Sequence, residues 1–74
     1  MKLYDAALFG AAVKRRRKEL GYTQQEVADV SGCSAAYLSA LENGKATAEL
    51  GRALRVASML GIDIVAMRRT GGEL

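Results

Sequence analysis

Polar side chains that can donate hydrogen bonds gather in one stretch of this chain, between residues 23 and 45. Amide, hydroxyl and ammonium groups of this kind bind phosphate oxygens and the edges of nucleic-acid bases. These donors include Gln24, Gln25, Ser34, Ser39, Asn43 and Lys45. The chain has no histidine, no paired-carboxylate pattern and no phosphate-binding glycine loop, so these residue types favour binding over catalysis.

Two short helices are predicted to carry these donors. Thr23 and Glu26 form a capping box, because each side chain can accept a hydrogen bond from a free backbone N–H near the other. Gly32 ends the first helix, Ser34 caps the second, and Asn43-Gly44 stops it. The apolar positions are Val27, Ala28 and Val30 in the first helix and Tyr37, Leu38 and Leu41 in the second. This is the layout of a helix-turn-helix, whose second helix lies in the DNA major groove.

Flanking helices are predicted to complete an all-α core, because two helices this short cannot fold alone. The first is capped by Asp5 and runs to about Leu20, and the fourth is capped by Thr47 and ends at Gly61. Their expected inner positions are Leu8, Phe9, Ala12, Val13 and Leu20, then Leu50, Leu54, Ala57 and Leu60. Gly10 interrupts the first helix at a cost of about 1 kcal/mol relative to alanine.

The segment from Ile62 to Met67 is apolar and β-branched, and periodicity cannot separate a strand from a helical turn in so short a run. A strand would have to pair with a second copy across a two-fold axis, because the chain offers no other strand. The residues assigned to dimerisation are Ile62, Ile64, Val65 and Met67. We expect one domain, with its core at about 5–61, a dimerisation segment at 62–68 and a flexible tail at 69–74.

Composition limits the classes of protein to which the chain can belong. Its 74 residues are half apolar and include no proline, which favours one small helical domain. The net charge of +3 suits an anionic partner, although the excess is modest. One cysteine and no histidine predict no metal site, and no cofactor is expected. No apolar run approaches about 18 residues, so we expect a cytoplasmic, nucleoid-associated protein that makes no membrane contact.

Several segments together resemble the XRE/Cro–C1 superfamily of helix-turn-helix repressors. They are RRRKELGYTQQEVADVSGCS, AAYLSALENGK and LGRALRVASMLGI. The ending LENGKATAELGRALRVASMLGIDI is similar to the HipB-like antitoxins, in which a short C-terminal strand pairs with its twin. Ala46 departs from that branch, where proline is usual, and this should loosen the loop without changing the fold.

The resemblance implies a five-element, lambda-repressor-like bundle with four main helices and a short C-terminal segment. It further implies a homodimer on a palindromic operator of double-stranded DNA, usually its own promoter, and a HipA-like serine/threonine kinase toxin as partner. Two alternatives stay open: a stand-alone regulator of the phage or restriction-control type, and a protein-interaction module without specific DNA binding. The alanine-rich third helix and the modest net charge favour the second of these.

In the expected complex with DNA, Gln24 would donate a hydrogen bond to a phosphate, with help from the helix N-terminus. Gln25 is a second candidate for a phosphate contact. Asn43 and Lys45 would reach the DNA backbone. The residues facing the groove would be Ser34, Ala35, Ala36 and Ser39. Because alanine contacts only thymine methyl groups, DNA shape, water and half-site spacing should carry much of the specificity. Tyr37 either packs at the edge of the core or places its hydroxyl on a phosphate.

The superfamily pattern pairs Arg17 with Glu42, and this ion pair would brace the first helix against the third. The basic run from Lys14 to Lys18 spreads around a helix, so only one or two of its members can face DNA. Four further arginines lie off the predicted DNA face, and the sequence does not decide between dimer, toxin and solubility roles for them. They are Arg52, Arg55, Arg68 and Arg69.

Overall fold

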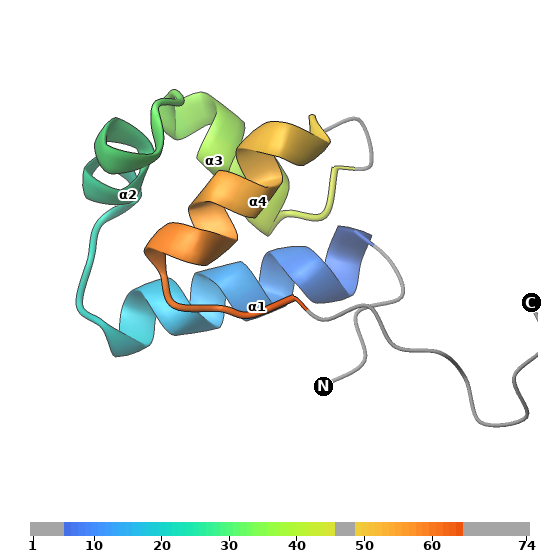
Figure 1. Cartoon of the computed structure of the whole chain (residues 1–74), viewed down its shortest axis with the longest axis horizontal. Helices are drawn as coiled ribbons and strands as arrows, with labels where there is room; N and C mark the ends of the chain where they lie inside the picture. Colours follow the sequence, from blue (N-terminus) through green and yellow to red (C-terminus); the bar gives the residue numbers. More distant parts are fainter. Residues whose placement is uncertain (1–5, 46–48, 65–74) are drawn as a thin grey trace, which may run out of the picture.

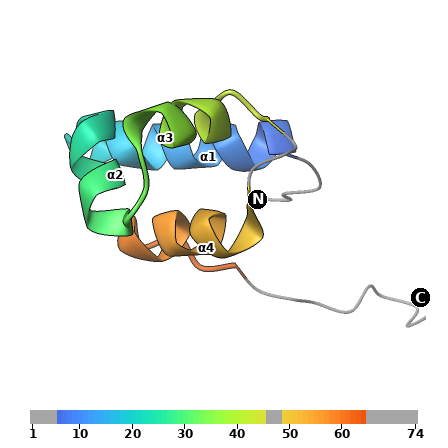
Figure 2. The same ribbon diagram turned by 90° about the horizontal axis from the view of Figure 1, so that it is seen from above.

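The computed structural model describes residues 6–45 and 49–64. This part of the chain forms four helices, α1 (Ala6–Glu19), α2 (Gln24–Ser31), α3 (Ala35–Glu42) and α4 (Leu50–Met59). In Figure 1, α1 lies along the base of the molecule and the other three helices lie above it. Figure 2 shows α1 and α3 on one side and α4 on the other, with α2 at one end. The predicted all-α, lambda-repressor-like fold is confirmed.

The C-terminal segment is the part of the fold prediction that is not borne out. Residues 62–64 form neither helix nor strand, and Val65 and Met67 lie outside the described residues. Within the described ranges, no helix has the length and apolar character needed to span a membrane.

The start signals of α2 and α3 have the predicted geometry. The Thr23 hydroxyl accepts a hydrogen bond from the Glu26 backbone N–H at 3.1 Å, and the Glu26 carboxylate accepts one from the Thr23 N–H at 2.8 Å. The Ser34 hydroxyl accepts from the Tyr37 N–H at 3.0 Å. Between the two helices, Gly32 has a φ of +72°, a left-handed conformation that residues with a Cβ rarely adopt. The tight turn that sets the angle between α2 and α3 therefore depends on this glycine.

The predicted start of α4 was wrong. The helix begins at Leu50, and Glu49 is its N-cap rather than a residue of its first turn. The Glu49 carboxylate accepts a hydrogen bond from the Gly51 N–H at 3.1 Å, so an acidic side chain fills the role assigned to Thr47. Thr47 itself lies outside the described residues, as does Asp5, the predicted cap of α1.

The core lies between the four helices and is smaller than the apolar pattern predicts. Its buried members are Val13, Val27, Leu38, Leu41, Ala53, Val56 and Leu60, and Phe9, Cys33, Tyr37, Met59 and Ile62 pack against them. Five predicted core residues are instead exposed, namely Leu8, Leu20, Val30, Leu50 and Leu54. In α4, the buried side is rotated away from the stripe through Leu50 and Leu54. Periodicity marks an apolar stripe but does not say whether another helix covers it.

Gly10 lies where α1 and α3 touch backbone to backbone. A Cβ atom at this position would overlap the carbonyl oxygen of Leu41 and lie 2.9 Å from that of Glu42. Nearby, a Cβ on Gly44 would lie 2.8 Å from the Cα of Ala7. The C-terminal end of α3 therefore packs directly on α1, and Gly10 is required for this contact, although the sequence marked it only as a weak point of the helix.

Candidate nucleic-acid interface

The buried centre of the candidate site is an ion pair between α1 and α3. The Arg17 Nε atom lies 2.7 Å from Glu42 Oε2, and Arg17 Nη2 donates to Glu42 Oε1 at 3.1 Å. Arg17 Nη1 donates to the Tyr22 carbonyl oxygen at 2.8 Å, in the connection between α1 and α2. Only 10% of the arginine side chain and 2% of the glutamate side chain are exposed. The structure thus contains the ion pair that the family pattern implies.

Gln24 joins this pair from the first turn of α2. Its Nε2 atom donates to Glu42 Oε1 at 3.1 Å, so one carboxylate binds side chains from both α1 and α2. Burial alone would raise the pKa of Glu42, but the hydrogen bonds from Arg17 and Gln24 outweigh it and hold the pKa below its ordinary value. An amide has two N–H donors. One is used here, and the other remains for the phosphate contact predicted for Gln24.

The outer side of α3 is open to solvent and has the residues predicted for the groove. Ser34 and Ala36 are exposed, Ala35 and Ser39 are partly exposed, and the buried side of the helix is formed by other residues. Those buried residues are Leu38, Leu41 and Glu42. Asn43 and Lys45, just beyond the helix, are also exposed. The helix can therefore enter a groove without unfolding, and it presents mainly small side chains.

Tyr37 takes the first of its two alternatives. Its ring packs against the core, its hydroxyl donates to the Glu49 carbonyl oxygen at 2.9 Å, and the Arg52 guanidinium lies 5.8 Å from the ring centroid. Burial raises the pKa of the Tyr37 hydroxyl, so its proton is retained. The O–H group thus donates within the protein in this structure.

Gln25 likewise has a partner within its own helix. Its Nε2 atom donates to Asp29 Oδ1 at 2.7 Å, one helical turn away. The amide again has a second N–H, but this contact directs the side chain along the surface of α2. Gln25 is therefore less well placed for DNA than Gln24, whose side chain is fixed against α3.

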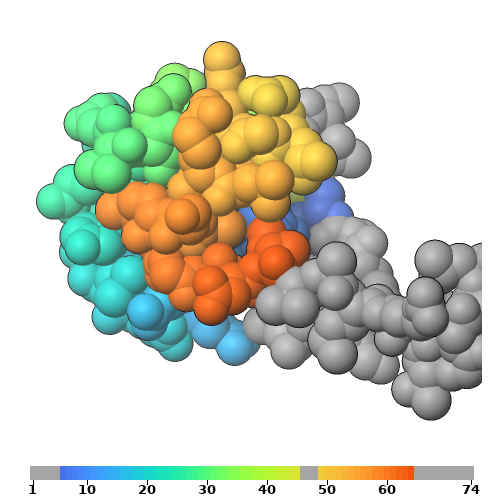
Figure 3. Space-filling model, viewed as in Figure 1, coloured from blue at the N-terminus to red at the C-terminus, as the bar shows by residue number. Residues whose placement is uncertain are grey.

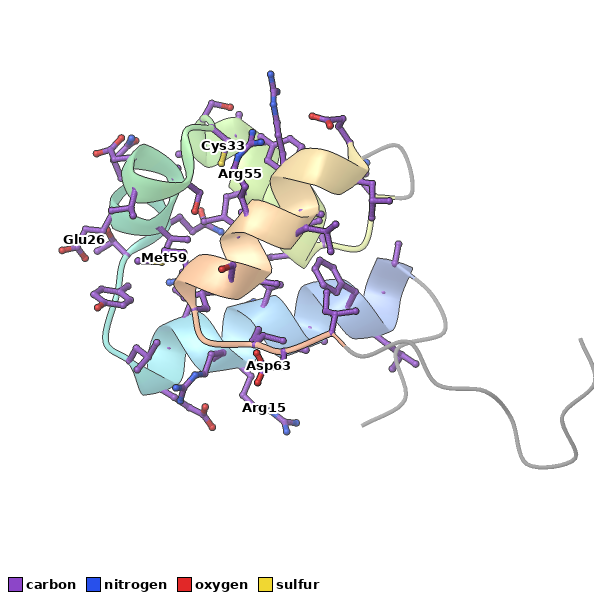
Figure 4. The ribbon with its side chains drawn as sticks, in the orientation of Figure 1. Arg15, Glu26, Cys33, Arg55, Met59 and Asp63 are labelled. Carbon is purple, nitrogen blue, oxygen red and sulfur yellow. The ribbon has the colours of Figure 1, made fainter. Side chains whose placement is uncertain are left out.

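Two arginines have structural contacts that the sequence did not reveal. Arg16 Nε donates to the Leu60 carbonyl oxygen at 2.9 Å and ties α1 to the end of α4. Arg55 Nε donates to the Ser31 carbonyl oxygen at 3.4 Å, and Figure 4 shows Arg55 beside Cys33 at the turn between α2 and α3. Both contacts join residues far apart in sequence, so no local pattern could have predicted them.

These features together define a helix-turn-helix DNA-binding protein. They are the glycine turn between α2 and α3, the solvent-exposed outer side of α3, and the buried Arg17–Glu42 ion pair that holds α3 against α1. Residues 13–66 match the helix-turn-helix family HTH_3. The chain belongs to this family of XRE-type transcriptional regulators, which are DNA-binding proteins and not enzymes.

Similar proteins include one from a bacterium and one from a bacteriophage. The chain is 44% identical over 67 residues to the uncharacterised HTH-type transcriptional regulator y4mF of Sinorhizobium fredii, and the match covers 88% of each chain. It is 32% identical over 68 residues to the ImmF control region 10 kDa protein of Bacillus phage phi105, covering 92% of this chain and 76% of the phage protein.

Solved structures with the same fold include complexes of HipB. The chain superimposes on HipB of a HipB–O4 20-mer complex with a TM-score of 0.82, 25% sequence identity, and coverage of 90% of this chain and 94% of that one. A HipA–HipB–O2–O3 complex gives the same values.

Proposed function

We propose that the chain represses transcription as a homodimer on a palindromic operator in its own promoter, as the antitoxin of a HipBA-type toxin–antitoxin pair. The observation that carries the proposal is the likeness to HipB over 90% of this chain, in complexes that contain operator DNA and HipA. The protein would act in the cytoplasm, at the nucleoid.

An exposed apolar surface on α4 supports the dimer. The exposed fractions are 70% for Leu50, 43% for Leu54 and 48% for Ile64. A shallow groove continues this surface, and it is lined by Leu54, Ala57, Ser58, Ile62, Asp63 and Ile64. Figure 3 shows α4 and residues 61–64 on one face of the molecule. We name Leu50, Leu54, Ile62 and Ile64 the α4 apolar flank, and we propose that a second copy covers it.

The small side chains of α3 make the dimer functionally necessary. Ala35 and Ala36 cannot form hydrogen bonds to bases, so one subunit reads little sequence. Two subunits on half-sites about 34–36 Å apart add the spacing between half-sites as a second source of specificity. The α4 apolar flank lies on α4 and the residues that follow it, and includes no residue of α3, so a second copy bound there need not cover the α3 residues predicted to face DNA.

A stand-alone regulator is the second candidate function. The similarity to a phage control-region protein at 32% identity favours it, as does the similarity to the HTH-type regulator y4mF. The two candidates share the DNA-binding mechanism and differ in the protein partner. A HipA-like kinase encoded beside this chain would favour the antitoxin, and its absence would favour the stand-alone regulator.

Two measurements test the proposal. Footprinting and native mass measurement on the DNA upstream of the chain's own coding sequence should give two subunits per site, with half-site centres about 34–36 Å apart. Co-expression with the neighbouring kinase should yield a stable complex that no longer inhibits growth. One subunit per site would contradict the dimer, and a kinase that ignores the chain would leave the stand-alone regulator.

A further inference from the structure

The five consecutive basic residues of α1 have different surroundings, and two of them are already bound to other parts of the protein. Arg17 is in the buried pair with Glu42. Arg16 binds the Leu60 carbonyl oxygen and lies 3.6 Å from Glu19. Figure 4 shows Arg15 pointing away from the other three helices. Lys14 and Lys18 remain, and both are exposed.

Lys14 lies on the side of α1 that faces the end of α3. Three residues define this side by their contacts: Ala7 lies against Gly44, Gly10 against the carbonyls of Leu41 and Glu42, and Arg17 against Glu42. Lys14 is four residues after Gly10 and three before Arg17, so it lies on the same side of the helix. Its side chain therefore leaves α1 next to the C-terminal end of α3, where Asn43 and Lys45 follow.

The electrostatics agree with this position. Burial opposes the ionisation of Glu42 and the hydrogen bonds from Arg17 and Gln24 favour it, and the positive charge of Lys14 also lowers the pKa of the carboxyl. Lys14 is thus close enough to Glu42 for its charge to matter. Gln24 lies against the same carboxylate, so the two side chains border one small region of the surface.

Lys14 has no counter-ion of its own in the described part of the chain. The ion pairs there are Arg16–Glu19, Arg17–Glu42 and Arg52–Glu49. Glu42 is nearly inaccessible and already accepts hydrogen bonds from Arg17 and Gln24. The ammonium group is therefore available for an anion outside the protein, beside the amide of Gln24.

We infer that Lys14 binds a DNA phosphate next to the one contacted by Gln24, and that it extends the DNA interface from α2 and α3 onto α1. This inference rests on the proposed DNA binding. According to this inference, Lys14 contacts DNA, whereas the side chain of Arg15, the next residue and of the same charge, stays in solvent.

The dependence of DNA affinity on salt tests this choice. Lys14→Ala should reduce the slope of log K against log salt concentration by about 0.9, the value for one phosphate contact on B-DNA. The loss should be the same on the upstream duplex and on a shuffled duplex, because a phosphate contact carries no sequence information. Lys14 is exposed, so the melting temperature of the variant should stay close to that of the wild type.

Arg15→Ala is the matched control, since it removes the same charge from the adjacent position of the same helix. Its slope should stay at the wild-type value. Equal slopes for Lys14→Ala and the wild type, or equal reductions in both variants, would overturn the inference while leaving the proposed function intact. Failure of the wild-type protein to bind either duplex in a salt-dependent way would instead remove the proposed function.

Discussion

Arg17 on α1 and Glu42 on α3 meet at 2.7 Å between Nε and Oε2, and Gln24 on α2 donates to the same carboxylate at 3.1 Å. One buried acid therefore joins three helices. The orientation of α3 depends on Glu42, whose side chain is only 2% exposed to solvent. The ion pair and the Gln24 contact therefore hold α3 in a fixed position relative to α1 and α2.

Removing the arginine should destabilise the protein strongly. Arg17→Ala leaves the Glu42 charge buried without its main partner, a change that costs about 3–5 kcal/mol in other proteins. Urea unfolding monitored by circular dichroism would measure the loss. Arg16→Ala, which removes a hydrogen bond to the Leu60 carbonyl oxygen, should cost only about 1 kcal/mol. An unchanged unfolding midpoint in Arg17→Ala would show that the Arg17–Glu42 pair does not stabilise the fold.

The same pair should make stability depend on pH in the acid range. The pKa of Glu42 is lower in the folded protein than its ordinary value, so the unfolded chain binds this proton more readily. The stabilisation is complete above the unfolded-state pKa of about 4.3 and is lost as the pH falls through that value and then through the lower folded-state pKa.

The variant Glu42→Gln lacks this titration. The difference in unfolding free energy between wild type and variant should therefore shrink as the pH is lowered from 7 to about 3. Urea titrations of both proteins across this range would measure it. A difference that stays constant with pH would show that the Glu42 charge does not contribute.

Replacing Gly10 with alanine should destabilise the protein, although helix propensity alone predicts that alanine stabilises a helix. Gly10→Ala would normally stabilise a helix by about 1 kcal/mol, but here the new methyl group overlaps the backbone of α3. We expect a net loss of about 1–3 kcal/mol, as for other overpacked cores. Ala11→Gly, on the exposed side of the same helix, should lose about 1 kcal/mol from propensity alone. A Gly10→Ala variant more stable than the wild type would disprove the close contact.

Local patterns predicted the parts of this fold that depend on neighbouring residues. The capping box of Thr23 and Glu26 and the turn at Gly32 are governed by backbone geometry within a few positions, so they could be seen in the sequence. The Arg17–Glu42 pair was predicted for a different reason, namely the resemblance to a family.

The errors concern residues whose role depends on distant parts of the chain. Leu50 and Leu54 have core-like spacing, but no other helix among residues 6–45 and 49–64 covers them. The sequence left both orientations of Tyr37 open, and a hydrogen bond to the carbonyl oxygen of Glu49, the N-cap of α4, selects one of them. Glycine is needed at position 10 because the backbone of α3 lies against it, and the spacing of residues along α1 does not reveal this contact.

The exposed α4 apolar flank predicts an effect on association. Leu50→Asp should convert the dimer to a monomer, because it places a charge in the proposed interface, while the isolated fold should tolerate it at a position 70% exposed. Val30→Asp is the control, since Val30 is 69% exposed and lies on α2, outside the flank. Sedimentation equilibrium would measure both. If both variants have the same molecular mass in solution as the wild-type protein, the α4 apolar flank is not the dimer interface.

Sequence-selective DNA binding is the central claim, and affinity for the chain's own upstream DNA as a function of salt tests it most directly. The wild-type protein should bind that duplex more tightly than a shuffled duplex of equal composition. Affinity should fall steeply with salt, by about 0.9 in log K per tenfold increase in salt for each phosphate neutralised. Equal, weak and salt-insensitive binding to both duplexes would contradict the claim.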